Sequence, residues 1–218
     1  MQIFAQTKIF KKKLTLRAQQ RSEELRAKFL IDVSVFEPEM LIFVDETGSD
    51  KRAALRKYGY ALRGRKAVSE RLLVKFKGKR YSAIAGLHMG HMLDVYMTAE
   101  NVKADTFCEY IECCLLPYLL PFNGTNPNSV DNASIHHVER VVRLIEDTGA
   151  MVLFLLPYSP DIMPIEECFS KVKSYICAND PLIQILSESE IKDMIISAFA
   201  TITPNNCYSW IDHCGYMK

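Results

Sequence analysis

Three acidic residues, Asp45, Asp131 and Glu166, occupy positions where an apolar segment ends or a helix begins. A carboxylate beside a buried segment costs desolvation free energy unless a cation binds there. Carboxylates gathered at one end of a sheet would suit two Mg²⁺ ions about 3.5–4 Å apart, a site able to catalyse in-line phosphoryl displacement. For any single acid, the alternative is a helix cap or a solvated surface position.

The other reactive side chains lack the partners that their chemistry requires. His88 and His91 could form half of a zinc site, but no further ligands occur at zinc-finger spacing. No glycine-rich phosphate loop is followed by a lysine, so we expect no nucleotide cofactor. The seven cysteines include no C-x-x-C pair, which favours buried, reduced thiols over disulfides or zinc. Only Cys214 stands beside a histidine, so a cysteine nucleophile has little support.

Positive charge is concentrated in residues 51–80. The 218-residue chain has a net charge of +1, yet this segment holds 12 of its 27 Lys and Arg residues and one acid, Glu70. Such a block is typical of a polyanion-binding surface, and nearby aromatic residues could stack on bases; a solvated lysine-rich loop is the alternative. The predicted nucleic-acid contacts are Arg56, Lys57, Arg63, Arg65, Lys66, Lys75, Lys77, Lys79, Arg80 and His136.

The apolar pattern predicts a mixed α/β fold. Strands are expected at 40–44, 81–87, 93–98 and 151–155, and a turn at Gly90 makes the first three an antiparallel meander. Helices are expected at 14–31, 106–118, 138–145 and 164–176, after the capping box 187–190, and around Trp210. The first helix should use Leu25, Phe29 and Leu30 as its apolar anchors. No membrane-spanning segment or secretory signal is evident, so we expect an intracellular protein, nuclear in a eukaryote.

Several ordered motifs resemble the catalytic domain of mariner-type transposases, in the Asp-Asp-Glu transposase and integrase superfamily. They are Val-Asp-Glu-Thr-Gly at 44–48, Asp-Asn-Ala at 131–133, Leu-Pro-Tyr-Ser-Pro-Asp at 156–161 and Pro-Ile-Glu at 164–166. The 34 residues between Asp131 and Glu166 are similar to the spacing in one branch of that family. The resemblance extends from about residue 20 to the C-terminus.

The resemblance implies an RNase H-like mixed sheet flanked by helices in residues 36–218, preceded by a basic, helical lead-in at 1–35. It also implies that Asp45, Asp131 and Glu166 bind two Mg²⁺ or Mn²⁺ ions. The activity implied is metal-dependent nicking of DNA at transposon ends and strand transfer, by a homodimer acting on paired ends. The motif and the helix phase favour Glu166 over Glu167 as the third acid.

The chain departs from the family pattern at three places. Val130 is the only apolar residue directly before Asp131, so we expect a short strand there. Met163 stands where the family usually has an Asn that can cap the helix of Glu166. Only about 40 residues precede Asp45, so we expect no sequence-specific end recognition in this chain. A truncated, transposase-derived protein that binds nucleic acid without cutting it is therefore the alternative function.

Overall fold

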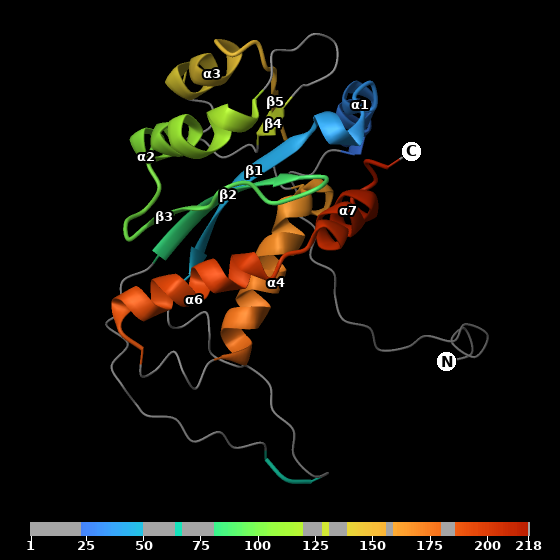
Figure 1. Cartoon of the computed structure of the whole chain (residues 1–218). Helices are drawn as coiled ribbons and strands as arrows, with labels where there is room; N and C mark the ends of the chain where they lie inside the picture. The colour runs from blue at the N-terminus through green and yellow to red at the C-terminus, as the bar shows by residue number, and fades with distance from the viewer. Residues whose placement is uncertain are drawn as a thin grey trace, which may run out of the picture.

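A five-stranded mixed sheet organises the computed structural model, which describes residues 23–49, 64–66, 81–119, 128–130, 139–155, 159–179 and 186–217. Its strands are β1 (Ile42–Ser49), β2 (Tyr81–His88), β3 (Tyr96–Thr98), β4 (Asn128–Val130) and β5 (Val152–Phe154). They lie in the order β3-β2-β1-β4-β5 (Figure 1). The pairs β1–β2 and β2–β3 are antiparallel, and the pairs β1–β4 and β4–β5 are parallel. The expected antiparallel meander within a mixed sheet is confirmed.

Strand β1 is longer than the sequence predicted. The prediction ended it before Asp45, whereas the strand continues to Ser49 and places Asp45 in its interior. The reason is the partner strand, because β2 pairs with β1 along its whole length, from Ile42 opposite His88 to Ser49 opposite Tyr81. A polar residue does not end a strand whose backbone bonds remain satisfied by its neighbour.

Strand β3 is shorter than predicted. The turn expected at Gly90 is present, because the backbone N–H groups of His88 and His91 each donate to the other's carbonyl oxygen. Leu93 then donates from its backbone to Gly86 and buries its side chain, and the regular ladder begins only at Tyr96. Residues 93–95 therefore have irregular backbone and do not extend the strand.

Helices cover both faces of the sheet (Figure 1). One face packs against α1 (Glu23–Val33), α4 (Pro164–Ala178), α6 (Glu188–Ala200) and α7 (Pro204–His213). The other packs against α2 (Ala104–Tyr110), the π-helical turn η3 (Ile111–Leu115), the 3-10 turn η4 (Leu116–Tyr118) and α3 (Glu139–Glu146). The short 3-10 turns η2 (Pro38–Met40) and η5 (Pro160–Ile162) precede β1 and α4. Central strand β1 contributes Phe43 to the first core cluster and Val44 to the second.

The predicted helix at 106–118 forms, but its winding changes along its length. The first turns are α-helical, residues 111–115 form a π-turn, and a 3-10 turn contains Pro117. Phe107, Tyr110 and Ile111 of the predicted apolar stripe are buried, whereas Tyr118 at its end is 38% exposed. The wider π-turn shifts the phase of the residues beyond it, so the stripe does not continue to Tyr118.

In helix α1 the buried face differs from the predicted one. Leu25 and Leu30 are exposed, whereas Arg26, Phe29 and Val33 are buried. These three positions follow the i, i+3, i+7 spacing of one helical face, and one of them is polar, so a search for apolar anchors alone missed this face. Phe29 and Val33 join the core cluster of α4 and α7.

The C-terminal helices agree more closely with the sequence. Helix α4 buries its predicted stripe of Ile165, Phe169, Val172 and Ile176 and extends to Ala178. The predicted capping box begins α6, and α7 contains Trp210. The seven cysteines are free thiols, of which Cys108, Cys114, Cys168, Cys207 and Cys214 are buried. None of the described helices is both long and apolar enough to cross a membrane.

Candidate active site

Asp45 projects from the face of the sheet that α4 covers. Side chains alternate along a strand, so Asp45 shares a face with Phe43, which belongs to the core cluster of α4. Its β2 partner, Ala85, belongs to the same cluster. Asp45 is only 7% exposed, and its Oδ1 accepts a hydrogen bond of 2.6 Å from the backbone N–H of Glu46. A buried carboxylate is therefore held on the inner side of the central strand.

On one side of Asp45 along this face of the sheet, the neighbouring side chains are small or polar. The two β2 residues opposite Asp45 and Thr47 are Ala85 and Ala83, which leave more room than the Leu87 opposite Phe43. The hydroxyl of Thr47 is buried and has no hydrogen-bond partner among the described residues. A buried polar atom without a partner costs free energy, so this region suits a polar ligand better than an apolar core.

Glu166 lies in the first turn of α4, the helix that packs against β1. Pro164 begins the helix, as Pro commonly does at a first helical position. The neighbouring Ile165 is fully buried, whereas Glu166 is half-buried, consistent with its place beside the apolar stripe. Met163 occupies the N-cap position and, as expected, provides no side-chain hydrogen bond to the helix. Its own side chain is buried.

Strand β4 leads toward Asp131, the second of the three predicted acids in chain order. It spans three residues, and its parallel register sets Val130 opposite Val44 of β1. Each of these two paired residues directly precedes an aspartate in the sequence, Asp131 and Asp45 respectively. β4 is as short as expected, yet it pairs with both β1 and β5.

Asp131 itself lies outside the described residues. Within the described part of the chain, no three His, Cys, Asp or Glu side chains form a metal-binding group.

Most of the predicted nucleic-acid contacts also lie outside the described residues. Of these positions, the structure describes only Arg65 and Lys66, both of which are exposed. The positions outside it are Arg56, Lys57, Arg63, Lys75, Lys77, Lys79, Arg80 and His136.

The histidine pair in the β2–β3 turn does not form half a zinc site. His88 Nε2 lies 2.8 Å from the carbonyl oxygen of Glu39, and its Nδ1 accepts a hydrogen bond from the backbone of Gly90. Both ring nitrogens of His88 therefore have hydrogen-bond partners within the protein. Burial, followed by the nearby His88, lowers the pKa of His91. The pair therefore belongs to the structure of the turn.

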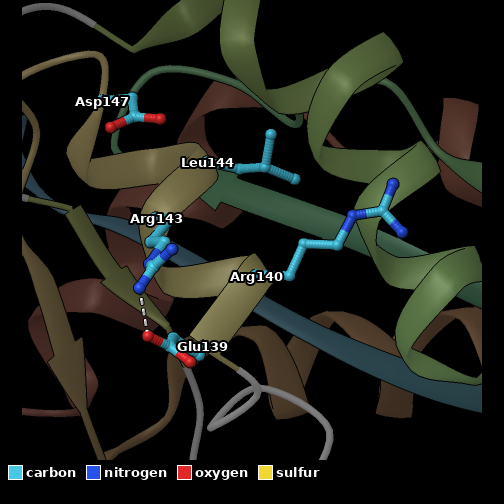
Figure 2. A pocket seen from close by; sticks show the side chains of 5 residues that line it. All are labelled: Glu139, Arg140, Arg143, Leu144 and Asp147. Carbon is cyan, nitrogen blue, oxygen red and sulfur yellow. Dashed lines mark hydrogen bonds and ion pairs between the residues drawn. The ribbon is translucent and has the colours of Figure 1, made fainter.

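A hollow on α3 lies on the opposite face of the sheet from Asp45. Figure 2 shows that Arg140 and Arg143 line it together with Glu139 and Asp147. Arg143 pairs with Glu139, and Arg140 donates to Asp105 at 3.1 Å. These exposed arginines are largely balanced by acids, so the hollow is not a strong anion site.

The sequence did not reveal a group of residues that holds the start of α4. Arg26 pairs with Asp161 in η5, and the hydroxyl of Tyr216 donates to the carbonyl oxygen of Ile162. Arg26 and Asp161 are 135 positions apart, and Tyr216 and Ile162 are 54 apart. No local sequence pattern links residues so far apart. One signal was available: Arg26 shares a helical face with Phe29 and Val33, and a charged residue on a buried face usually has an ion-pair partner.

The strand order and the helix layers on both faces of the sheet define an RNase H-like fold. Residues 40–185 match the family described as DDE superfamily endonuclease, and the chain belongs to this family. No curated protein sequence matches the chain.

Solved structures with the same fold include three of the Mos1 transposase. A pre-cleavage Mos1 transpososome has 17% identity and a TM-score of 0.72, over 94% of this chain and 64% of the other. A Mos1 mariner paired-end complex with Mn has 17% identity and a TM-score of 0.68, over 93% and 63%. The Mos1 catalytic domain has 14% identity and a TM-score of 0.61, over 91% of each chain. The chain thus has the fold of a mariner transposase catalytic domain and spans less than two thirds of the chains in the two larger assemblies.

Proposed function

We propose that this chain is the catalytic core of a transposase, which nicks DNA at transposon ends and transfers the strands to a target. The observation that carries the proposal is the register of the central sheet, in which Val44 lies opposite Val130, so that strands leading to Asp45 and Asp131 run side by side. The packing of α4 against β1 supplies Glu166 from the covering helix layer.

The residues around Asp45 suit hard divalent cations. Carboxylate oxygens are the ligands preferred by Mg²⁺ and Mn²⁺, and the unpartnered Thr47 hydroxyl beside small alanine side chains gives the region room and polarity. We infer that Asp45, Asp131 and Glu166 would hold two such ions. When bound, these ions supply activation of water or a DNA 3′-hydroxyl and stabilisation of the leaving oxygen. The buried Asp45 provides a fixed ligand, because its carboxylate is held by the Glu46 N–H.

The basic segment is assigned to the DNA backbone. The Lys and Arg residues of this segment, 51–80, would neutralise DNA phosphates. Because neutralised phosphates release their counterions, the affinity for DNA should fall as the salt concentration rises. Action as a homodimer on paired ends, and a nuclear location in a eukaryotic host, follow from the same proposal. The Mos1 assemblies of paired transposon ends support the pairing.

The test is nicking of supercoiled plasmid in Mg²⁺ and in Mn²⁺ by the protein and its Glu166→Gln variant. We expect nicking to require metal and to fall at least about 100-fold in Glu166→Gln, since removal of one ligand misplaces the reacting groups. Asp45→Asn and Asp131→Asn should behave alike. The matched control is Glu167→Gln, which alters the adjacent half-buried acid and its contact of 3.4 Å with His213. It should retain nicking within a few-fold.

The alternative function predicts a different pattern. A protein that binds DNA without cutting it would show equal, background nicking in all these variants while retaining salt-dependent DNA binding. The three-residue strand β4 before Asp131 favours this alternative, and so does Met163, which leaves the helix of Glu166 without a side-chain cap. Circular dichroism on each preparation establishes that the compared proteins are folded.

A further inference from the structure

The turn that leads into α4 is held by a buried arginine of α1. Arg26 donates from Nη1 to Asp161 Oδ1 at 3.1 Å and from Nη2 to Oδ2 at 2.8 Å. Arg26 is 8% exposed, so this ion pair is shielded on its cationic side. A bidentate arginine–carboxylate pair fixes orientation as well as distance. Asp161 stands in η5, five positions before Glu166.

Tyr216 connects the same turn to the strand of Asp45. Its hydroxyl donates to the carbonyl oxygen of Ile162 at 2.7 Å, in a buried hydrogen bond. Its ring packs edge-on against Phe43, with 4.9 Å between the centroids. Phe43 precedes Asp45 by two positions and lies on the same face of β1. Burial raises the pKa of Tyr216, which keeps the hydroxyl protonated and able to donate.

The first turn of α4 has no side-chain cap. Its N-cap residue, Met163, makes no side-chain cap, and the backbone N–H of Glu166 bonds to the Met163 carbonyl oxygen. The N-terminal ends of α6 and α7 differ, because each is closed by a capping box. Contacts from outside the helix therefore carry more of the positioning at α4 than at the other two helices.

We propose that Arg26 and Tyr216 are positioning residues that set the placement of Glu166 relative to Asp45. The role of the two acids in this proposal rests on the proposed function. Neither residue is assigned a contact with DNA or metal; each acts through η5, and Tyr216 acts also through Phe43. A misplacement of about 1 Å in an active site can lower a rate about 100-fold, so such supports matter for catalysis.

The experiment compares Tyr216→Phe and Arg26→Met with the unaltered protein. Mn²⁺ binding is measured by electron paramagnetic resonance without DNA, and nicking is measured as kcat and as KM for plasmid. We expect Mn²⁺ affinity and kcat each to fall about 10- to 100-fold, with KM changed less than about twofold. Arg26→Lys keeps the charge without the two-pronged geometry and should restore only part of the loss.

Two control variants separate positioning from general destabilisation. Tyr208→Phe removes a hydroxyl from a 48% exposed tyrosine of α7 and should change neither the Mn²⁺ affinity nor kcat. Ser187→Ala weakens the α6 cap and should lower stability without altering Mn²⁺ affinity. A loss of Mn²⁺ affinity in Ser187→Ala as large as in Tyr216→Phe would overturn the proposal.

Hydrogen exchange distinguishes failure of this proposal from failure of the proposed function. Amides of residues 159–167 should exchange faster in Tyr216→Phe and Arg26→Met, while those of α6 stay unchanged. Unchanged exchange, Mn²⁺ affinity and kcat in both variants, with loss in Glu166→Gln, would overturn the positioning role and leave the proposed function intact. If the unaltered protein neither binds Mn²⁺ nor nicks DNA, the proposed function fails, and the positioning role of Arg26 and Tyr216 in catalysis fails with it.

Discussion

Gly86 allows two separate chain segments to approach β2 closely. A Cβ atom at this position would lie 2.8 Å from Leu93 Cδ1 and 2.8 Å from the hydroxyl oxygen of Tyr110. The Leu93 backbone also donates to the Gly86 carbonyl oxygen at 2.8 Å. A side chain at residue 86 would therefore force apart the packing that buries both Leu93 and Tyr110.

We expect Gly86→Ala to lower the free energy of unfolding by about 1–3 kcal/mol, because it overpacks a filled core. The matched control is Gly90→Ala, where the nearest atom to the new Cβ, His88 Nδ1, lies 4.0 Å away. This control should stay within about 0.5 kcal/mol of the unaltered protein. Urea unfolding followed by circular dichroism measures both. Equal losses in the two variants would contradict the packing explanation.

At the scale of elements, the helices differ in how their N-terminal ends are satisfied. In α6 the Ser187 hydroxyl accepts from the backbone of Glu190 at 3.4 Å, and the Glu190 carboxylate accepts from the backbone of Ser187 at 2.7 Å. In α7, Thr203 and Asn206 make the same reciprocal pair. Lys171 of α4 donates to Asn206 Oδ1 at 2.5 Å and so joins two of the helices.

The cap of α6 gives a prediction with a defined pH dependence. Ser187→Ala should destabilise the protein by about 1 kcal/mol at neutral pH, the usual cost of losing an N-cap. Hydrogen bonds from the Ser187 side chain, then from its backbone, lower the pKa of Glu190 below its ordinary 4.5. Glu190 therefore stabilises the fold above pH 4.5, and this contribution is lost as the pH falls through the lowered value. The difference between the two proteins should shrink in that acid range.

Thermal unfolding of both proteins between about pH 3 and pH 7 measures this difference. The matched control is Ser197→Ala, which removes a mid-helix hydroxyl that donates only to the Asp193 carbonyl oxygen. It should be neutral or slightly stabilising at every pH, because serine lowers helix propensity. A pH-independent loss in Ser187→Ala would argue against the role of Glu190.

The elements that the sequence predicts well are those set by local chemistry. The capping box at 187–190 and the apolar stripe of α4 depend on residues three or four positions apart, and both are confirmed. The full length of β1 was not predictable, because it depends on pairing with β2 more than 30 positions away. The sequence did not predict the role of Arg26 for the same reason, because its partner Asp161 is 135 positions away. The buried face of α1 was also predicted from apolar residues alone, and this criterion excludes an arginine.

At the scale of the whole molecule, the sheet separates two apolar clusters, one on each face. Each cluster contains buried cysteines. Cys168 and Cys207 lie in the cluster of α4 and α7, and Cys108 and Cys114 lie in that of α2. The reactivity of each pair therefore measures how often its own helix layer opens. Burial raises the pKa of each of these four thiols. Burial also raises the pKa of Cys214 to about 11. A thiol in such surroundings is both inaccessible and protonated, so it is a poor nucleophile.

We therefore expect iodoacetamide to modify Cys113 first in the native protein, because its side chain is exposed. The five buried thiols should react about a thousandfold more slowly, as modification then requires opening that costs about 4 kcal/mol or more. Mass spectrometry of digested samples identifies each modified cysteine over time, and Cys113→Ser should remove the fast phase. If Cys168 and Cys207 react before Cys108 and Cys114, the layer of α4 and α7 opens first; reaction of all seven at one rate would contradict a packed core on either face.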